Sequence, residues 1–407
     1  MNASPLRVLM VSDVYFPRVN GVSTAIETYR RNLAALGVQV ELLAPDYGDN
    51  AHQNGITRVR ARRVPFDPED RLMHWRRLRR TAIRLARYTD LVHIHTPFAA
   101  HYAGVAAARC YGLPVVSSYH TLFEEYLELY APMVPSAWLR GFARTLARRQ
   151  CRALTATIVP SCAMAERLAA YGVRDGVSVL PTGVPTAQFR IADRATRREQ
   201  FRQRLGIDPD TPVALFVGRA AHEKNIGFLI ESLVIARKRA PSLMLLIAGE
   251  GPALTSLREL ARKTGQSEVV RFLGYLDRDR DLPDCYAAAD LFAFASRTET
   301  QGLALIEAMA AGLPVVALAE MGTRDLLSAN RGAMVTNDDT SAFARALADL
   351  ALDVDARRLL GEEATALAEK WSDVALTGRL AQLYHSLASQ PRRGFNSWKA
   401  LSKARQA

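Results

Sequence analysis

Two carboxylates separated by seven residues give the sequence its clearest chemical signal. Residues 299–307 read Glu-Thr-Gln-Gly-Leu-Ala-Leu-Ile-Glu, so Glu299 is expected in a loop after a strand and Glu307 about two turns inside the next helix. Gly302 would let the backbone approach a ligand closely, and the helix N-terminus would offer N–H groups to an anion. Glu307 is then placed to accept hydrogen bonds from a diol such as a ribose. Taken alone, the pattern also fits a loop acid and an exposed helix acid.

Two cations lie in an earlier segment that is expected to follow a strand. Residues 216–225 read Phe-Val-Gly-Arg-Ala-Ala-His-Glu-Lys-Asn, which places Arg219 and Lys224 on either side of a helix start. A guanidinium can bridge two phosphate oxygens, and an ammonium adds a point charge. The segment therefore predicts a phosphate-binding loop, and solvated surface cations are the alternative.

The elements that must position these residues alternate between apolar strands and helices along the chain. The strand 6–13, the helix 23–36 and the strand 38–44 form a βαβ start, and a second start begins with the strand 212–218. Later strands are expected at 91–95, 114–119, 154–160 and 177–180, and then at 243–248, 269–273, 291–295 and 314–318. Two such runs predict an α/β fold of two doubly wound, Rossmann-like domains that face each other across a cleft.

The domain boundaries follow from changes in composition. A polar, arginine-rich stretch from about 192 to 204 is expected to join the two domains. We predict an N-terminal domain at 1–190, a C-terminal domain at 191–370, a helix at 371–389 that packs back, and a basic tail at 390–407. The tail is expected to be disordered, with docking on a membrane as the alternative.

Length and composition exclude several classes of protein. The chain has 407 residues, enough for two domains, and no apolar run approaches the roughly 20 residues that span a bilayer. No cleavable signal pattern precedes the first strand, so we expect a cytosolic protein. Its four cysteines lack the spacing of a zinc site and are expected to be free thiols. The acids Asp277, Asp279 and Asp281 alternate with arginines, which predicts a solvated loop and no metal site.

Positive charge is concentrated in the first half of the chain. Residues 1–185 hold 23 Arg, no Lys and 14 acidic residues, a net charge of +9, against +3 for the remaining residues. A one-sided field of this kind favours an anionic partner such as a membrane lipid, a nucleic acid or a phosphorylated substrate. A nucleic-acid binder would interleave aromatic and basic residues, and only Trp75 and Trp138 fit, so we expect no nucleic-acid partner.

Taken together, the motifs resemble the retaining glycosyltransferases with the GT-B fold, carbohydrate-active family 4, also known as glycosyltransferase group 1. The similarity runs from Arg7 to about Tyr384. The segments that carry it are Asn20-Gly21-Val22, Ser118-Tyr119-His120-Thr121, Gly218-Arg219 with Glu223-Lys224, Gly249-Glu250-Gly251-Pro252, and Glu299 to Glu307.

The resemblance implies a role for each residue of the donor site. Arg219 and Lys224 would hold the diphosphate and stabilise the departing nucleotide in place of a metal ion. Glu299 would hold a sugar hydroxyl, and Glu307 the ribose. Beside the sugar, His120 would contact a hydroxyl and support the forming positive charge, although a lone histidine after a strand is more often structural. The residues expected to contact the donor are Gly21, Gly218, Arg219, Lys224, Glu299, Gln301, Gly302, Leu303 and Glu307, and those expected to act in catalysis are His120, Arg219, Lys224 and Glu299.

Acceptor selection is expected in the N-terminal domain. Residues 71–87 read as one helix with an apolar stripe flanked by arginines, a pattern typical of a helix on an anionic membrane. The alternative is a helix that packs its stripe on the sheet. The segment 120–130 is similar to monoglycosyl-diacylglycerol synthases of the family, but Leu129 replaces a usual histidine. The residues expected to face the acceptor or the membrane are Trp75, Arg76, Arg77, Arg79, Arg80 and Tyr126.

These observations predict a peripheral enzyme on the inner face of the cell membrane that needs no cofactor and no metal. Its partners would be a sugar nucleotide, a lipid acceptor and the anionic membrane surface. We expect glucose from UDP-glucose on a diacylglycerol-type lipid, and the alternative is a GDP-mannose-dependent α-mannosyltransferase. A soluble acceptor and a sugar-nucleotide epimerase of similar architecture remain rival readings, the latter disfavoured because no water-activating acid pair is evident.

Overall fold

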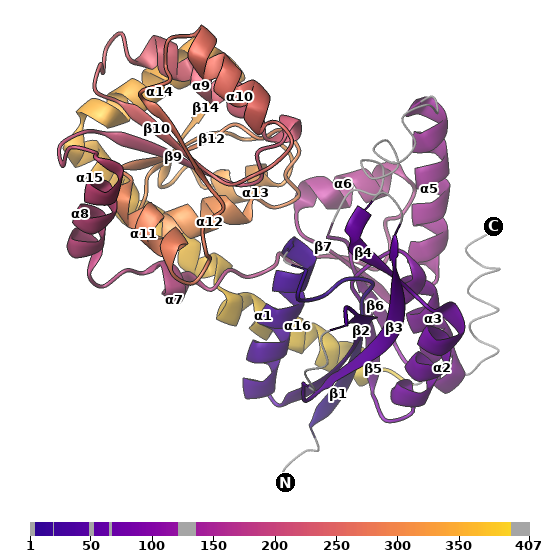
Figure 1. The fold of residues 1–407 in the computed structure, drawn as a ribbon. Coiled ribbons are helices and arrows are strands. Elements are labelled where there is room, and N and C mark those ends of the chain that lie inside the picture. The colour runs from indigo at the N-terminus through magenta and orange to yellow at the C-terminus, as the bar shows by residue number, and fades with distance from the viewer. Residues whose placement is uncertain (1–4, 19, 49–52, 65–66, 121–135, 392–407) are drawn as a thin grey trace. The chain divides into compact units, whose positions relative to one another are not determined.

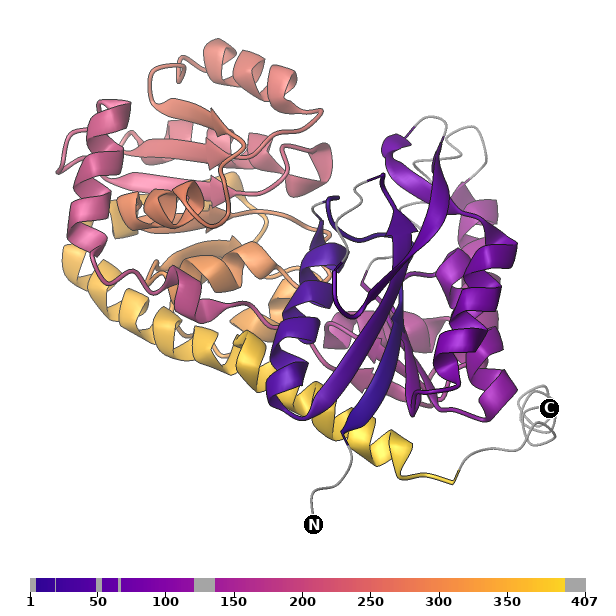
Figure 2. The same ribbon diagram turned by 60° about the horizontal axis from the view of Figure 1, so that its bottom comes forward.

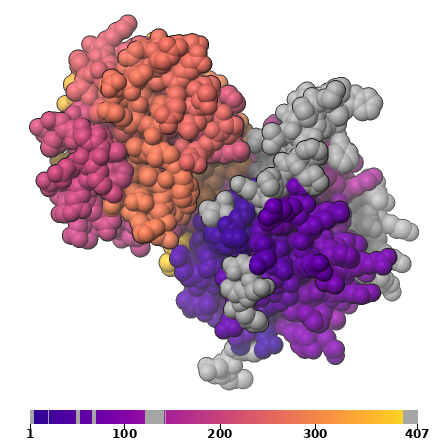
Figure 3. Space-filling model, viewed as in Figure 1, coloured from indigo at the N-terminus to yellow at the C-terminus, as the bar shows by residue number. Residues whose placement is uncertain are grey.

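A computed structural model describes residues 5–18, 20–48, 53–64, 67–120 and 136–391 of the chain. The chain divides into two compact units. Unit 1 comprises Met1–Gly183 and Asp373–Ala407, and unit 2 comprises Val184–Ser372. Each unit is built around its own mainly parallel sheet (Figure 1), and the space-filling view shows one face of its surface (Figure 3).

The sheet of unit 1 has the strand order β4-β3-β2-β1-β5-β6-β7-β8, and every neighbouring pair is parallel except β3 and β4. Its central strands are short apolar runs, and Val8, Leu9, Met10 and Val11 are fully buried, as expected where helices cover both faces of a parallel sheet. The strands are β1 (Leu6–Val11), β2 (Val38–Asp46), β3 (Ile56–Val64), β4 (Asp67–Met73), β5 (Leu91–Ile94), β6 (Val115–Ser118), β7 (Ala156–Val159) and β8 (Val177–Val179).

Helices cover the two faces of this sheet. The helices α2 and α3 pack together on one face, and α1 and α16 pack together on the other (Figure 2). The C-terminal helix α16 belongs to unit 1 because Asp373 accepts hydrogen bonds from Arg31 (3.0 Å) and Asn32 (2.9 Å) of α1. The helices are α1 (Gly21–Ala35), α2 (Trp75–Ala86), α3 (Ala99–Tyr111), α5 (Ser136–Arg152), α6 (Cys162–Ala170) and α16 (Asp373–Ala388).

The sheet of unit 2 is parallel throughout, in the order β11-β10-β9-β12-β13-β14. Its strands are β9 (Val213–Val217), β10 (Met244–Ala248), β11 (Val270–Gly274), β12 (Leu291–Phe294), β13 (Val315–Leu318) and β14 (Ala333–Thr336). Its helices are α7 (Thr186–Phe189), α8 (Arg194–Leu205), α9 (Ile226–Ala236), α10 (Leu254–Lys263), α11 (Asp281–Ala288), α12 (Leu303–Ala310), α13 (Thr323–Leu327), α14 (Thr340–Leu352) and α15 (Val354–Ala368), with 3-10 turns η1 (His222–Lys224) and η2 (Glu369–Trp371). Around this sheet, α9 packs against α10 and α14, α8 packs against α11, and α12 packs against α15.

The expected joint at 192–204 is wrong, because this stretch forms helix α8. Three of its five arginines, Arg194, Arg198 and Arg202, donate hydrogen bonds to carbonyl oxygens at the C-terminal ends of neighbouring helices. Arg202 is 2% exposed and donates to the carbonyl oxygen of Ala288 (2.9 Å), and Arg194 donates to that of Ala311 (2.9 Å). Cations at helix C-termini are favoured by the helix dipole, so an arginine-rich composition here marks a packed helix and not a linker.

The boundary between the units also differs from the expected 190/191. It falls between Gly183 and Val184, and the short helix α7 belongs to unit 2. The reason is Phe189, which is fully buried in the core of unit 2 and meets the ring of Tyr286 edge-on at 5.5 Å. Among the helices that the structure describes, none has the length and apolar character needed to cross a bilayer.

Candidate active site

Strand order places the candidate residues at one edge of each sheet. In unit 2, strands β9 to β11 follow one another toward one side of the sheet and strands β12 to β14 toward the other, so the strand order reverses between β9 and β12. In unit 1 the strand order reverses between β1 and β5. In doubly wound sheets, ligands bind outside the carboxyl ends of the strands at such reversal points. The loops that follow β9, β12, β1 and β5 are therefore the first places to look for a site.

In unit 2 the loop after β9 is held against the loop after β10 by backbone contacts. Gly218 donates to the carbonyl oxygen of Ala248 (3.0 Å), and Ala220 donates to that of Glu250 (2.9 Å). Gly249 has a φ of +141°, and a Cβ atom there would lie 1.9 Å from the carbonyl oxygen of Gly218. The Gly-Glu-Gly-Pro motif is thus explained by close packing that fixes the loop carrying Arg219.

The same β9 loop brings Lys224 to Glu299. Asn225 donates from its side chain to the carbonyl oxygen of Ala295 (3.2 Å), and Ser296 donates to that of Glu223 (3.3 Å), so the loops after β9 and β12 are tied together. Nζ of Lys224 lies 2.5 Å from Oε1 of Glu299, and their side chains are 22% and 18% exposed. A cation and a carboxylate are therefore fixed side by side at the reversal point of unit 2.

The loop that carries Glu299 continues into the N-terminus of α12. Gln301 is buried, and Gly302 is the N-cap residue with a φ of +85°, a left-handed conformation that favours glycine. Leu303 is the first helical residue, so the free N–H groups of this helix end begin beside Glu299. The structure brings the predicted residues of unit 2 onto neighbouring loops, with exposed Arg219 and part-buried Gly218 on the β9 side.

Glu307 lies further along α12 and is almost fully buried. One carboxylate oxygen pairs with the guanidinium of Arg278, and the other accepts from the hydroxyl of Tyr286 (3.1 Å). Burial raises the pKa of Tyr286 well above its ordinary range, so its hydroxyl stays protonated and donates. Although burial opposes its charge, Arg278 has a raised pKa because Glu307 stabilises the guanidinium. A carboxylate has about four acceptor positions, so Glu307 retains capacity for a diol alongside both partners.

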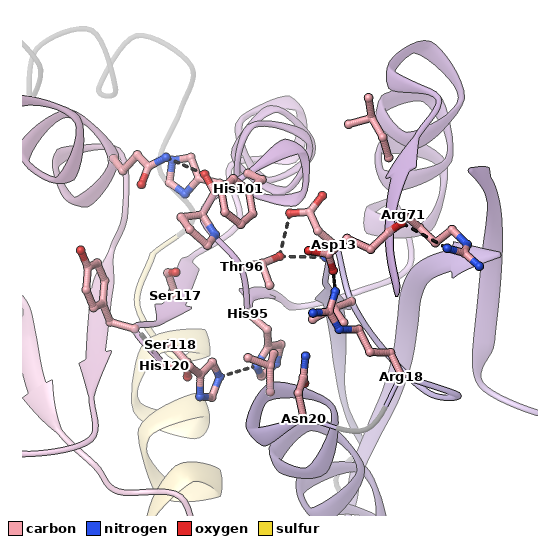
Figure 4. Close-up of a pocket in the computed structure, with 18 of the residues that line it drawn as sticks. Asp13, Arg18, Asn20, Arg71, His95, Thr96, His101, Ser117, Ser118 and His120 are labelled. Atoms are coloured by element: carbon pink, nitrogen blue, oxygen red, sulfur yellow. Dashed lines mark hydrogen bonds and ion pairs between the residues drawn. The ribbon is translucent and has the colours of Figure 1, made fainter. Parts of the chain in front are cut away.

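Unit 1 contains a pocket of about 300 Å³ at the carboxyl ends of β1, β5 and β6 (Figure 4). At its polar end, Asp13 accepts from Oγ1 of Thr96 (2.8 Å) and from the backbone N–H of Ala100 (3.1 Å), which caps helix α3. Burial raises the pKa of Asp13 to about 6 against these hydrogen bonds, which lower it. The apolar lining comes from Val14, Val22, Val64, Leu72, Phe98 and Leu154.

Three histidines of unit 1 form a chain of contacts beside this pocket. Nδ1 of His95 lies 3.2 Å from Nε2 of His120, and the ring of His95 lies 4.0 Å from that of His93. His95 and His120 line the pocket (Figure 4). Burial lowers the pKa of His120 to about 4 and that of His93 to about 3, and it lowers the pKa of His95 well below its ordinary range. The cluster is therefore uncharged at neutral pH.

The predicted glycine of unit 1, Gly21, is the first residue of α1. Asn20 is the N-cap, and its side chain accepts from the N–H of Ser23 (2.8 Å). A Cβ atom at Gly21 would meet nothing within 4 Å, so packing within unit 1 does not require glycine there. Its small size leaves the N-terminus of α1 open to an approaching anion.

The single helix expected over 71–87 is wrong. Residues up to Met73 belong to β4, and α2 begins at Trp75. Leu78 and Ala82 of the apolar stripe are fully buried, because α2 packs against α3, so the stripe faces the core and not a membrane. Leu72 and Trp75 stay nearly half exposed. Four exposed arginines in the first two turns of α2 are called the α2 arginine cluster below: Arg76, Arg77, Arg79 and Arg80. Tyr126 lies outside the described residues.

Comparison with known proteins identifies the family. The protein-family model described as "Glycosyl transferases group 1" matches residues 197–367, and the family model described as "Glycosyltransferase Family 4" matches residues 19–188. A GDP-mannose-dependent alpha-mannosyltransferase from Mycobacterium tuberculosis is 30% identical over 80% of this chain and 82% of its own. The chain belongs to the group 1 glycosyltransferases. A second relative, the alpha-monoglucosyldiacylglycerol synthase of Streptococcus pneumoniae, is 29% identical over 79% of this chain and 73% of its own.

Solved structures agree on the architecture. HepE from Anabaena, crystallised in complex with UDP, superposes with a TM-score of 0.72 at 18% identity and covers 94% of this chain and 100% of its own. The likeness shows the GT-B arrangement of two Rossmann-like domains. The predicted family and fold class are confirmed.

Sequence reasoning missed four residues of this glycosyltransferase that lie at its sheet edges or against its site: Asp13, His93, His95 and Arg278. A signal was present for two of them, because His93 and His95 stand at alternate positions of the otherwise apolar stretch 91–95, which predicts that they point to the same side. Asp13 ends an apolar strand, but its role as the cap of α3 depends on strand order. Arg278 was set aside as part of a solvated loop.

Proposed function

We propose that this glycosyltransferase moves glucose from UDP-glucose to a membrane lipid such as diacylglycerol and retains the anomeric configuration. The bond between the anomeric carbon and the diphosphate oxygen breaks, the acceptor hydroxyl oxygen bonds to that carbon on the same face, and the hydroxyl proton passes to the departing diphosphate. The single observation that carries the proposal is the fixed pair of Lys224 and Glu299 at the reversal point of unit 2.

Lys224 and Glu299 fit the two needs of the donor. The ammonium of Lys224, with the exposed guanidinium of Arg219 in the same loop, stabilises charge that develops on the departing diphosphate. The carboxylate of Glu299 accepts from a sugar hydroxyl, while the N–H groups from Gln301 to Leu303 face the phosphate and sugar. Because the side chains are already held in place, they need little reorganisation when the bond breaks. We infer that these cations replace a metal ion.

A lipid acceptor is supported by unit 1. Its pocket has an apolar lining, and Leu72 and Phe98 on that lining are 46% and 47% exposed. The α2 arginine cluster lies on the exposed side of the helix that follows Leu72, where it can meet anionic lipid headgroups. The S. pneumoniae relative is named for the synthesis of a glucosyldiacylglycerol. We accordingly propose a peripheral location on the inner face of the cell membrane.

A second candidate donor is GDP-mannose. It is favoured by the relative from M. tuberculosis, whose name states that it depends on GDP-mannose. The four side chains assigned to the donor in unit 2, those of Arg219, Lys224, Glu299 and Glu307, serve phosphate, sugar and ribose in the proposed arrangement, so their assigned roles do not distinguish the nucleotide bases.

The proposal is tested with purified enzyme and mixed vesicles that contain diacylglycerol. UDP-glucose and GDP-mannose are compared as donors, with and without EDTA, and the lipid product is analysed by proton NMR for the configuration at the anomeric carbon. We expect an α-linked glucolipid whose rate of formation does not change with EDTA. A β-linked product, an EDTA-sensitive rate, or transfer only to water-soluble acceptors would each contradict the corresponding part of the proposal.

A further inference from the structure

Strand pairing brings His95 and His120 together. His93 lies in β5 and pairs with Val116 in the register of β6, so the residues that follow the two strands are neighbours at the carboxyl edge of the sheet. His95 follows β5, and His120 follows β6. Their 3.2 Å contact between Nδ1 and Nε2 is therefore a consequence of sheet order and is fixed by the core of unit 1.

The ring of His95 has little freedom to turn. It is 1% exposed and lies 4.0 Å from the ring of His93 on one side and 6.1 Å from the ring of Tyr29. His93 is itself held at both nitrogens, because Nδ1 lies 2.5 Å from the hydroxyl of Tyr384 and Nε2 lies 2.8 Å from that of Ser118. The stack therefore presents Nδ1 of His95 to His120 in one orientation.

The tautomers of the two histidines depend on each other. A neutral imidazole carries a single N–H, so one ring of the pair must donate and the other must accept. If His95 donates from Nδ1, His120 carries its proton on Nδ1. If His120 donates from Nε2, the proton of His95 moves to its own Nε2, a buried atom with no hydrogen-bond partner among the described residues. Either way, the tautomers of His95 and His120 are coupled.

We propose that His95 is a positioning residue that holds His120 in one tautomer and so fixes the role of the other ring nitrogen, Nδ1, toward the substrate. The inference rests on the proposed function, in which His120 contacts a hydroxyl of the transferred sugar. A neutral, oriented imidazole can make that contact without repelling the positive charge that develops at the anomeric carbon. His93 and Tyr29 support this arrangement indirectly, because their rings lie beside the ring of His95.

The tautomer can be read directly. Enzyme labelled with ¹⁵N-histidine is studied by two-dimensional proton–nitrogen NMR, and the ring of His120 is assigned with the variant His120→Asn. We expect a single tautomer in the wild-type protein and a mixture, or the opposite tautomer, in His95→Phe, which keeps an aromatic ring but has no ring nitrogen. An unchanged tautomer of His120 in His95→Phe overturns the proposal.

Kinetics separate positioning from a packing role. The variants His95→Asn and His95→Gln carry the same amide, but the shorter side chain places it near the position of Nδ1 and the longer one near that of Nε2. Loss of the hydrogen bond that orients a metal-bound histidine lowers metal affinity or activity about 10- to 100-fold, and we expect a loss in the same range here. We expect that loss in kcat for His95→Phe and His95→Gln, an unchanged KM for the nucleotide sugar, and recovery of most of the loss in His95→Asn.

Equal losses in the Asn and Gln variants would also overturn the proposal, because a role in packing or polarity alone treats the two alike. Circular dichroism checks that each variant is folded, and the Asn and Gln pair decides the question if His95→Phe does not fold. His385→Asn, at an exposed position of α16, is the control and should leave both readouts unchanged. If the wild-type enzyme transfers no sugar, the proposed function fails, while the NMR result still decides whether His95 sets the tautomer.

Discussion

Replacing Lys224 by Met tests the donor site most directly, because it separates catalysis from stability. The substitution keeps most of the apolar stem and removes the charge 2.5 Å from Oε1 of Glu299. In the proposed reaction that charge stabilises the departing diphosphate. In the free protein it serves only a partly exposed ion pair. The two effects should therefore differ greatly in size.

The magnitudes follow from the geometry. A unit charge about 3 Å from a phosphate oxygen, at an effective dielectric constant of about 20, contributes about 5 kcal/mol. Removal of one fixed donor to a developing anion lowers kcat by about 10²- to 10³-fold, or about 3–4 kcal/mol. The folded protein should lose far less. The two side chains are 22% and 18% exposed, and an ion pair near the surface contributes about 1 kcal/mol or less, which lowers Tm by about 2–4 °C.

The assay measures nucleotide release by chromatography at saturating UDP-glucose, beside thermal unfolding of the same samples. Lys263→Met is a matched control in the same unit, because Nζ of Lys263 lies 2.9 Å from Glu259 on the exposed face of α10. We expect the control to keep full activity. The reasoning is refuted if Lys224→Met retains more than about a tenth of the wild-type kcat, or if Lys263→Met loses as much activity as Lys224→Met.

Three further predictions address other parts of the molecule. Conversion of the α2 arginine cluster to glutamine should weaken binding to anionic vesicles in a sedimentation assay at low salt, and high salt should abolish the difference between variant and wild type. Binding of the wild-type protein that does not depend on vesicle charge would contradict the proposed membrane contact. Arg278→Met leaves the buried carboxylate of Glu307 without its cation, so it should lower the stability of unit 2 by about 3 kcal/mol and raise the KM for the donor; a variant as stable as wild type would contradict this. Because folding holds His93, His95 and His120 neutral, the unfolded chain binds more protons below pH 6.5, and the free energy of unfolding should fall as pH drops from 6.5 toward 4. His120→Asn should reduce that slope by at most about 1.4 kcal/mol per pH unit in urea titrations, and an unchanged slope would show that His120 is not held neutral.

The sheets and the donor loops were predictable because their signals are local. Apolar runs such as 8–11 are buried on both faces, and the acid–glycine–acid segment from Glu299 to Glu307 marks a loop followed by a helix. The strands β3 and β4 were missed because β4 is the edge strand of its sheet and β3 lies next to it. In β3, Val59 faces inward, and the arginines Arg58, Arg60 and Arg62 alternate with inward positions. In the sequence this segment therefore looks like a charged stretch and not like an apolar strand.

The rest depends on which strands are neighbours, and no local pattern states that. His95 and His120 are far apart in sequence and meet only because β5 pairs with β6. Asp13 caps α3 because β1 lies beside β5. The arginines of α8 looked like a linker because their partners, the carbonyl oxygens at the ends of α11 and α12, are about 90 residues or more further along the chain.

The two units hold side chains of different charge at the carboxyl ends of their strands, and the proposed reaction requires that difference. Unit 2 places Lys224 and Arg219 on the loop after β9, where a diphosphate that gains negative charge is best held. Unit 1 places three histidines at the carboxyl ends of its strands, two of them buried and His120 half-buried, and desolvation keeps them uncharged. A sugar that gains positive charge as its bond breaks would be destabilised by an imidazolium at close range, whereas a neutral imidazole in a fixed tautomer can hold its hydroxyl. A substitution that charges the histidine cluster, such as Ser118→Asp beside Nε2 of His93, should therefore slow transfer even where nucleotide binding is intact.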